Sequence, residues 1–330
     1  MRVLVTGGAG FIGSHYVRQA ISGEYASVRD AEIVVLDKLT YAGNRANLDP
    51  VADSPRLRFV RGDICDPAVV GEAMTGVDLV VHFAAESHVD RSILGASDFV
   101  LTNVLGTQNL LQAALDAGVG RFVHVSTDEV YGSIEQGSWS EDHVLEPNSP
   151  YSASKASSDL VARSFHRTYG LPVCVTRCSN NYGPYQFPEK VIPLFVTNLL
   201  DGKPVPLYGD GLNVRDWLHV DDHCRGIQLV ADGGRPGEIY NIGGGTELTN
   251  RELTERLLAA VGVGWEMVER VEDRLGHDRR YSVDITKISR ELGYRPEVDF
   301  EAGLADTVRW YAENRQWWEP LKERAALAAR

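Results

Sequence analysis

The chain contains few cysteines, and none of them is spaced like a metal ligand. Its 330 residues hold four, Cys65, Cys174, Cys178 and Cys224, with no Cys-x-x-Cys pair and no histidine at zinc-finger spacing. The sequence therefore predicts neither a disulfide framework nor a metal site. Because each cysteine lies in an apolar or strand-like context, we expect four buried free thiols.

Positive charge and long apolar runs are also scarce. Lys and Arg number 33 against 46 Asp and Glu, a formal net charge of −13 that argues against a nucleic-acid partner. No run approaches the roughly 20 apolar residues that span a bilayer. A strand pattern begins at Met1 in place of a signal peptide. We expect a cytoplasmic protein with no membrane partner.

A glycine-rich turn separates a strand pattern from a helix pattern near the N-terminus. Arg2-Val3-Leu4-Val5-Thr6 precedes Gly7-Gly8-Ala9-Gly10-Phe11-Ile12-Gly13, and a helical pattern follows. In this context the glycines let the backbone approach a pyrophosphate at the N-terminal end of a helix, although a plain tight turn is the alternative. The next strand pattern ends in Asp37, where a carboxylate binds ribose hydroxyls and repels a 2′-phosphate. The pattern predicts NAD rather than NADP.

The order of strand and helix patterns predicts the fold class. Strand-helix units repeat as far as residue 180, which is typical of a Rossmann-type, doubly wound parallel α/β sheet. Prolines and short segments then indicate a smaller, mixed α/β lobe. We predict that residues 1–180 and about 215–245 form an NAD-binding domain. Residues about 181–214 and 246–330 would form the substrate-binding lobe, with a helical tail from Glu301 onward.

Polar residues follow the predicted strand 121–125. Ser126-Thr127-Asp128-Glu129 comes directly after it, and Tyr151-x-x-x-Lys155 follows a polar loop. Ligand sites in open parallel sheets form beyond the carboxyl ends of strands, where this run falls. Helical spacing puts Tyr151 and Lys155 on one face, and a nearby ammonium favours the phenolate of a tyrosine base. A helix start with a surface lysine is the alternative.

At these motifs the chain resembles a known family over essentially its whole length. The glycine turn with Tyr151-x-x-x-Lys155 is similar to the extended short-chain dehydrogenase/reductases. Three further motifs resemble the nucleotide-sugar 4,6-dehydratases of that superfamily: Ser126-Thr127-Asp128-Glu129-Val130-Tyr131-Gly132, Ser179-Asn180-Asn181-Tyr182-Gly183-Pro184-Tyr185-Gln186 and Arg215-Asp216-Trp217. The acid pair is diagnostic because elimination of water needs a base and an acid close together.

The resemblance implies the catalytic roles. Tyr151 would take the C4 hydroxyl proton while hydride passes to NAD, and Lys155 would lower the pKa of Tyr151 and hold the nicotinamide ribose. Thr127 would bind the sugar hydroxyl. Glu129 would then remove the C5 proton, and Asp128 would protonate the departing C6 hydroxyl. Return of the hydride to C6 regenerates NAD, so the implied reaction converts dTDP-glucose to its 4-keto-6-deoxy product in deoxysugar biosynthesis.

The resemblance also implies two larger sets of binding residues. Those expected to bind NAD are Gly7, Gly10, Phe11, Ile12, Gly13, Asp37, Lys38, Leu39, Thr40, Asp63, Ile64, Phe83, Ala84, Ala85, Thr102, Tyr151, Lys155 and Asn181. Those expected to bind the nucleotide sugar are Glu86, Ser87, His88, Thr127, Asn180, Lys190, Val191, Pro206, Leu207, Tyr208, Arg215, Asn250, Arg274, His277 and Tyr281. The preference for thymidine rests on the resemblance alone.

Alternatives remain open at this point. A 4-epimerase or a uronate decarboxylase would share the fold, but Asp128 and Glu129 count against both. A non-catalytic NAD-sensing protein would be expected to have lost the catalytic residues. Leu275 and His219 depart from the family pattern, which usually has proline and tyrosine there. Helices near Asp98–Ala117 and Tyr151–Tyr169 pair into a dimer in related proteins, so we expect a homodimer.

Overall fold

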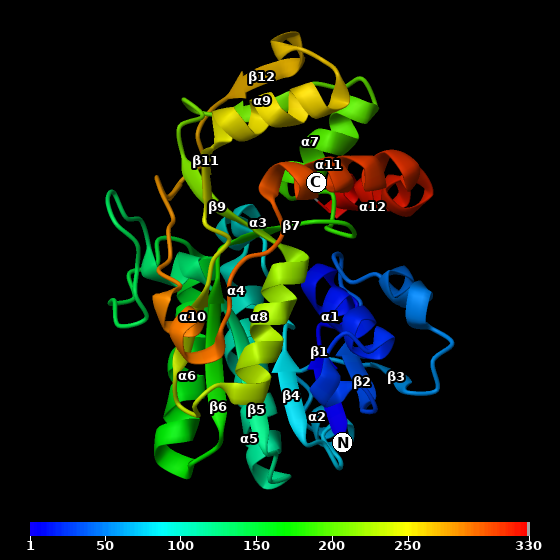
Figure 1. Ribbon diagram of the computed structural model, residues 1–330, viewed down its shortest axis with the longest axis vertical. Helices are drawn as coiled ribbons and strands as arrows, with labels where there is room; N and C mark the ends of the chain where they lie inside the picture. Colours follow the sequence, from blue (N-terminus) through cyan, green and yellow to red (C-terminus); the bar gives the residue numbers. More distant parts are fainter. Residues whose placement is uncertain (329–330) are drawn as a thin grey trace.

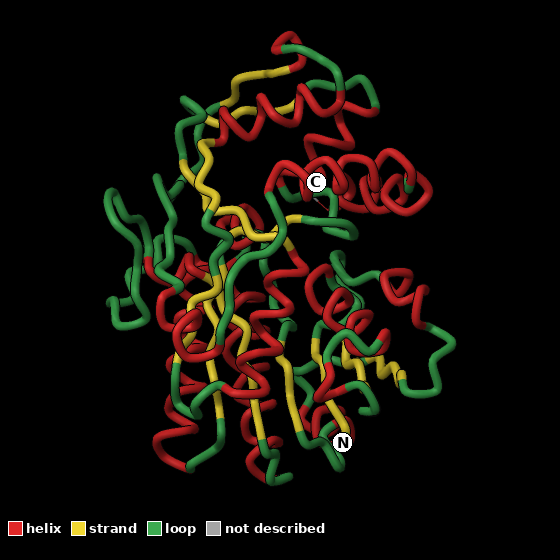
Figure 2. Tube along the Cα trace, in the orientation of Figure 1, coloured by secondary structure: helices red, strands yellow, loops and turns green. Residues whose placement is uncertain are grey.

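The computed structural model describes residues 1–328, and a seven-stranded sheet forms its centre (Figures 1 and 2). The strand order is β10-β6-β5-β4-β1-β2-β3, and every pair is parallel. The strands are β1 (Arg2–Thr6), β2 (Glu32–Asp37), β3 (Leu57–Arg61), β4 (Leu79–His82), β5 (Arg121–Thr127), β6 (Val173–Cys178) and β10 (Ile239–Ile242). The chain runs outward from β1 in both directions, so the predicted doubly wound, Rossmann-type fold is confirmed.

Helices cover both faces of this sheet. Alternate residues of β1 point to opposite faces, with Val3 and Val5 in one buried cluster and Leu4 in another. One face is covered by α1 (Phe11–Ser22), α8 (Val220–Gly233) and α10 (Thr286–Leu292), and the other by α2 (Pro67–Ala73), α5 (Thr107–Asp116) and α6 (Pro150–Tyr169). Burial on both faces explains why the strands read as continuous apolar runs.

A further group of elements lies beyond the carboxyl ends of the large sheet (Figure 1). A three-stranded sheet contains β7 (Asn180–Tyr182), β9 (Val214–His219) and β11 (Thr246–Thr249), and a parallel pair contains β8 (Val205–Tyr208) and β12 (Val268–Val271). The helices α7 (Val191–Leu200), α9 (Asn250–Val261), α11 (Phe300–Glu313) and α12 (Arg315–Ala328) share a separate core. The proposed division into two domains stays a prediction. Of the two strands within the segment 215–245 that we assigned to the NAD-binding domain, β10 joins the large sheet, whereas β9 pairs with β7 and β11.

Some details differ from the sequence-based expectations. The helix expected over 98–117 consists of α4 (Ala96–Phe99), a π-helical segment (Val100–Gly106) and α5. Cys174, Cys178 and Cys224 are buried free thiols as expected, but Cys65 is only half-buried because it lies on the loop between β3 and α2. The end of the predicted helical tail, residues 329–330, lies outside the described residues. None of the helices within 1–328 is long and apolar enough to cross a membrane.

The start of α6 is set by its capping residues. The Ser149 hydroxyl accepts a hydrogen bond from the Ser152 backbone N–H at 3.1 Å, and the Ser152 hydroxyl accepts one from the Ser149 backbone N–H at 3.0 Å. Pro150 occupies the first turn of the helix. A capping box and an N-terminal proline both favour a helix beginning at this point. Tyr151 therefore lies in the first turn of α6, next to the end of β5.

A buried ion cluster holds α6 against the sheet. Asp159 of α6 lies 2.9 Å from the Arg177 guanidinium of β6 and 3.3 Å from His124 of β5. Burial by itself raises the pKa of Asp159, but Arg177 and His124 outweigh it and lower that pKa to about 2. The helix that carries Tyr151 and Lys155 is thus fixed to the two strands whose ends form the site.

Candidate active site

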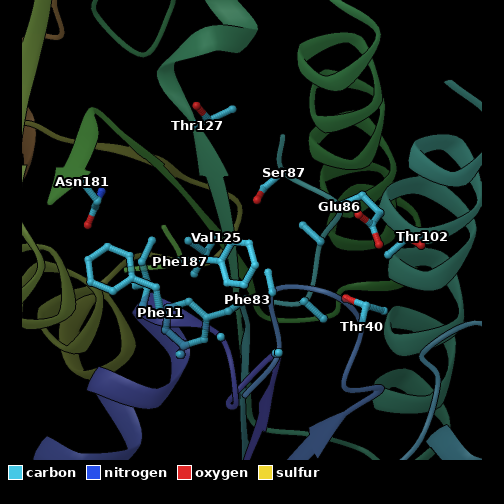
Figure 3. A pocket seen from close by; sticks show the side chains of 18 of the residues that line it. Phe11, Thr40, Phe83, Glu86, Ser87, Thr102, Val125, Thr127, Asn181 and Phe187 are labelled. Carbon is cyan, nitrogen blue, oxygen red and sulfur yellow. The ribbon is translucent and has the colours of Figure 1, made fainter. Parts of the chain in front are cut away.

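A single cavity collects most of the residues predicted from the sequence. It lies where β1, β2, β4, β5 and β6 end, and its lining includes Gly10, Asp37, Ala84, Thr127 and Tyr151. Figure 3 shows side chains from these separate elements converging, among them Phe11, Phe83 and Phe187. The carboxyl edge of a parallel sheet is the usual place for such a site.

The glycine turn is shaped for close approach of a ligand. Gly7 has φ +69°, and a Cβ there would lie 2.6 Å from the backbone N of Ala84. A Cβ at Gly13 would collide with the Gly7 carbonyl, whereas one at Gly10 would meet only that carbonyl, at 3.2 Å. Gly7 and Gly13 are thus required by the turn itself, and Gly10 leaves open the space in front of α1. An anionic pyrophosphate fits this position at the helix N-terminus.

Asp37 joins the glycine turn to the end of β2. Its carboxylate accepts from the backbone N–H groups of Ala9 at 2.9 Å and Leu39 at 2.8 Å. Burial raises its pKa, and these two donors partly offset the effect. The nearby Asp63, which is also expected to bind NAD, forms an ion pair with Lys38 at 2.6 Å. The residues present fit a dinucleotide with free ribose hydroxyls.

Of the residues predicted to bind NAD, all but Leu39 line the cavity. Leu39 has φ +58° and contributes its backbone N–H to Asp37. The cavity wall also contains residues outside the predicted binding sets: Leu36, Ala42, Gly43, Gly62, Val125, Ser126, Cys178, Ser179, Gln186, Phe187 and Glu189. Ser126 belongs to the polar run after the predicted strand 121–125, and Cys178 lies at a strand end, which is a signal that could have found it. Phe187 and Glu189 lie on an irregular loop without such a pattern.

Thr127, Asp128 and Glu129 lie at the end of β5 and in the 3₁₀ turn Asp128–Tyr131. The Thr127 hydroxyl lies 3.2 Å from an Asp128 carboxyl oxygen and accepts the Glu129 backbone N–H, also at 3.2 Å. Asp128 is 2% exposed, and its second oxygen has no hydrogen-bond partner among residues 1–328. The unpaired oxygen points to a group that acts on a ligand.

The two carboxyls have different electrostatic surroundings. Burial raises the pKa of Asp128 well above its usual range, and the charges of Glu129 and Asp216 add to the effect. Burial also raises the pKa of Glu129, but Arg274, Lys190 and Arg215 act against it. The environments therefore favour a protonated Asp128 beside an ionised Glu129, which is the division of roles that an acid and a base require.

Tyr151 and Lys155 both line the same cavity. The Lys155 ammonium donates to the Val125 carbonyl at 2.8 Å, and burial lowers its pKa to about 8. Burial, followed by the charge of Glu129, raises the pKa of Tyr151 well above 10. Within the chain alone, burial thus outweighs the lowering of the Tyr151 pKa that we expected from Lys155.

The predicted substrate residues divide into two groups. Glu86, Ser87, Thr127, Asn180 and Lys190 line the cavity, whereas the following lie outside its wall: His88, Val191, Pro206, Leu207, Tyr208, Arg215, Asn250, Arg274, His277 and Tyr281. Several members of this outer group contact one another. The Arg215 guanidinium lies 4.1 Å from the ring centre of Tyr281, and the rings of Tyr208 and His277 are 6.4 Å apart. Their binding roles stay predictions.

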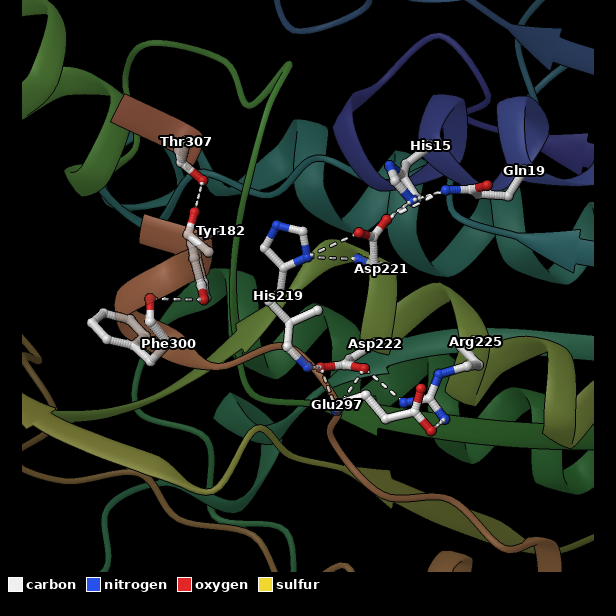
Figure 4. Close-up of polar contacts among 12 residues, drawn as sticks. His15, Gln19, Tyr182, His219, Asp221, Asp222, Arg225, Glu297, Phe300 and Thr307 are labelled. Atoms are coloured by element: carbon white, nitrogen blue, oxygen red, sulfur yellow. Dashed lines mark hydrogen bonds and ion pairs between the residues drawn. The ribbon is translucent and has the colours of Figure 1, made fainter. Parts of the chain in front are cut away.

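The two departures from the family pattern lie away from the cavity wall. Leu275 is 78% exposed on its loop. The His219 ring accepts the Asp221 backbone N–H at 3.3 Å and packs edge-on against Tyr182, with ring centres 5.1 Å apart. The Asp221 carboxylate lies between two histidines: one oxygen is 3.4 Å from the His219 ring nitrogen, and the other is 2.5 Å from a ring nitrogen of His15 in α1 (Figure 4). His219 thus takes part in a polar contact between α1 and α8.

Comparison with known proteins agrees with this geometry. Residues 4–307 match the model of a family described as GDP-mannose 4,6 dehydratase. A dTDP-glucose 4,6-dehydratase of Streptomyces antibioticus is 66% identical over 99% of this chain and 97% of its own length.

Two solved structures are also similar. DesIV, a dTDP-glucose 4,6-dehydratase of Streptomyces venezuelae solved with NAD and a second ligand, is 71% identical, with a TM-score of 0.96 over 97% of this chain and all of its own. A dTDP-glucose 4,6-dehydratase of Bacillus anthracis in complex with NAD is 48% identical, with a TM-score of 0.90 over 97% and 99% of the two chains.

The fold and the site define a member of the extended short-chain dehydrogenase/reductases. Within them, the chain belongs to the nucleotide-sugar 4,6-dehydratase family.

Replacement of Asp128 by asparagine should stabilise the protein. Because the folded-state pKa of Asp128 is raised, its ionisation opposes folding as pH rises from the unfolded-state pKa toward the folded-state pKa. Asparagine keeps the shape and has no such ionisation, so we expect a higher Tm for Asp128→Asn, with the advantage growing as pH rises above about 4, the ordinary pKa of an aspartate. Thermal unfolding at several pH values measures this, and a variant that is less stable at every pH would contradict it.

Proposed function

We propose that this chain is a dTDP-glucose 4,6-dehydratase that converts dTDP-glucose to dTDP-4-keto-6-deoxyglucose and water. The observation that carries the proposal is the buried Asp128 beside Glu129, facing the same cavity as the glycine turn and Tyr151. A 4-epimerase or decarboxylase has no step that uses such a pair. The high identity to relatives that carry this name supports the same substrate.

NAD fits the glycine turn and Asp37, and when bound it supplies the hydride acceptor at C4 and the hydride donor at C6. Gly10 and the N-terminus of α1 would receive its pyrophosphate, and Asp37 its adenosine ribose. Lys155 would hold the second ribose from the other end of the cavity. No net oxidation results, so the chain needs no second redox partner.

The first proton is removed at the C4 hydroxyl. Tyr151 takes it as a phenolate, with Thr127 binding the sugar hydroxyl beside it. Burial opposes ionisation of this phenol, whereas the Lys155 ammonium and the positive ring of a bound nicotinamide would favour it. Since the pKa of Lys155 is about 8, its help is lost as pH rises through that value.

The elimination step then uses the two carboxyls that directly follow β5. A ketone at C4 acidifies the proton on C5, and the ionised Glu129 removes it. The protonated Asp128 donates to the C6 hydroxyl, which leaves as water. Burial raises the pKa of both carboxyls, and the cations Arg274, Lys190 and Arg215 oppose the effect at Glu129, which favours different protonation states before the substrate arrives. The same cations are suited to the substrate diphosphate.

Homodimerisation also belongs to the proposal. Leu101 and Leu105 of the π-helical segment and Leu160 of α6 are 44–55% exposed, and the two elements pack side by side. Exposed apolar side chains on adjacent helices form a surface suited to a second copy. The cytoplasmic location stays a prediction.

The dimer surface is tested by charge substitution. We expect a particle of about 73 kDa, twice the 36.3 kDa chain, and a shift toward the monomer in Leu101→Asp with Leu160→Asp. Leu275→Asp, at an exposed loop position, is the matched control and should leave the mass unchanged. Light scattering on an eluting column gives the masses, and a monomeric parent protein would refute the dimer.

The reaction itself is tested with dTDP-glucose. The purified protein should form a 4-keto-6-deoxy product, detected by the absorbance that the keto sugar develops in alkali, without added oxidant. Formation of the C4 epimer with no keto product would instead favour an epimerase. Absence of both products from protein with NAD bound would overturn the proposal.

The acid and base roles are tested by isosteric variants. Asp128→Asn and Glu129→Gln should retain NAD but lose about 10²–10⁴-fold in keto-product formation, the usual range for a lost acid or base. In the parent protein the rate should fall on the acid side as Glu129 becomes protonated, at a pH above the ordinary glutamate value because its pKa is raised. Unchanged turnover in both variants would refute these roles.

A further inference from the structure

Three segments far apart in the sequence meet at the rim of the cavity. The loop after β2 contributes Thr40 and Gly43 to the lining, the loop after β4 contributes Ser87, and the loop before α7 contributes Phe187 and Glu189. Residues of these same segments also contact one another across the rim. Three of the side chains involved, Tyr41, Arg91 and Glu189, have no predicted catalytic or binding role.

Arg91, in the short helix α3 (Val89–Leu94), is at the centre of these contacts. Both its Nε and an Nη atom donate to one Glu189 carboxylate oxygen at 3.1 Å. The Arg91 and Glu189 side chains are 22% and 11% exposed, so their ion pair is largely shielded from water. Shielded ion pairs with good geometry are costly to break, whereas exposed pairs contribute little.

The same guanidinium stacks on Tyr41, in the loop after β2. Its carbon lies 3.9 Å from the centre of the Tyr41 ring, within the range of a cation–π contact. The Tyr41 ring also meets the Phe187 ring edge-on, with centres 5.8 Å apart. A further contact joins the loop after β4 to the segment before α7, because the Lys190 ammonium donates to the Ser87 carbonyl at 2.8 Å. Tyr41, Arg91 and Glu189 together therefore join all three segments.

The chemistry of the reaction explains why such a connection is useful. The hydride removed from C4 returns to C6, so one NAD serves every turnover and has no need to exchange. We propose that Tyr41, Arg91 and Glu189 form a latch across the cavity rim that retains NAD through successive turnovers. This inference rests on the proposed function. The three residues act as positioning residues, since they hold the loops that line the cofactor site and take no part in proton transfer.

The test measures release of NAD rather than turnover alone. Protein loaded with radiolabelled NAD is diluted into excess unlabelled NAD, and the bound label is followed over time in Glu189→Gln, Tyr41→Leu and Tyr41→Phe. We expect release about 10-fold or more faster in the first two, because loss of contacts in a bound complex acts mainly on the dissociation rate. Tyr41→Phe keeps the ring and should release NAD at the parent rate.

A matched control is the ion pair between Arg256 and Glu301, whose atoms lie 2.7 Å apart far from the cavity. Glu301→Gln removes the same charge and should not change the release rate. Keto-product formation per bound NAD should also stay at the parent value in Tyr41→Leu, because Tyr41 is not part of the cavity wall. Unchanged release in both variants, or equal acceleration in Glu301→Gln, would overturn the latch. If Glu189→Gln does not fold, the NAD release rates of Tyr41→Leu and Tyr41→Phe are sufficient to test the latch.

Failure of the proposed function gives a different result. In that case the parent protein forms no keto product, while the NAD release rates can still be measured because they need no sugar substrate. A parent protein that makes product, with release rates unaffected by the variants, contradicts the latch and leaves the dehydratase activity standing.

Discussion

The rest of the site depends on two adjacent carboxyls directly after β5, the buried Asp128 and the half-buried Glu129. A buried carboxyl is expensive to ionise, and Asp128 and Glu129 also repel each other. Arg274, Lys190 and Arg215 oppose this effect at Glu129, whereas Arg215 is the one cation that opposes it among the main causes at Asp128, so the surroundings favour an ionised Glu129 beside a protonated Asp128. Water elimination follows from this asymmetry, because an acid and a base stand side by side before any substrate binds. Without these two carboxyls, the glycine turn, Tyr151 and Lys155 would indicate only a general dehydrogenase.

The sheet supports this arrangement through interactions that are mostly local in sequence, and local patterns are what a sequence reveals. The run from β1 through the glycine turn into α1, the Asp37 end of β2 and the capped start of α6 were all predictable. Each depends on neighbouring residues: a strand period, a glycine at φ +69°, a serine cap with a following proline. Ligand sites in open parallel sheets form beyond the carboxyl ends of strands, and this rule predicted that Thr127 and Tyr151 lie close together although a long loop separates them in the sequence.

Long-range packing was not predictable in the same way. Phe187 and Glu189 reach the cavity through an irregular loop, and Tyr41 meets Arg91 only because three separate segments converge. The π-helical turn at Val100–Gly106 left no pattern distinct from an ordinary helix. The electrostatics of Tyr151 also depended on the fold, since burial by the surrounding elements and the charge of Glu129 raise its pKa. A rim held together by such contacts suits an enzyme that returns its hydride to the same sugar.

The path of that hydride tests the account most directly. The protein is given a mixture of dTDP-glucose deuterated at C4 and unlabelled dTDP-glucose, and the product is examined by mass spectrometry and NMR. We predict deuterium at C6 of the keto product, transferred within each molecule and without exchange between labelled and unlabelled substrate. Loss of the deuterium to solvent, its retention at C4, or its appearance in released NADH would contradict the mechanism.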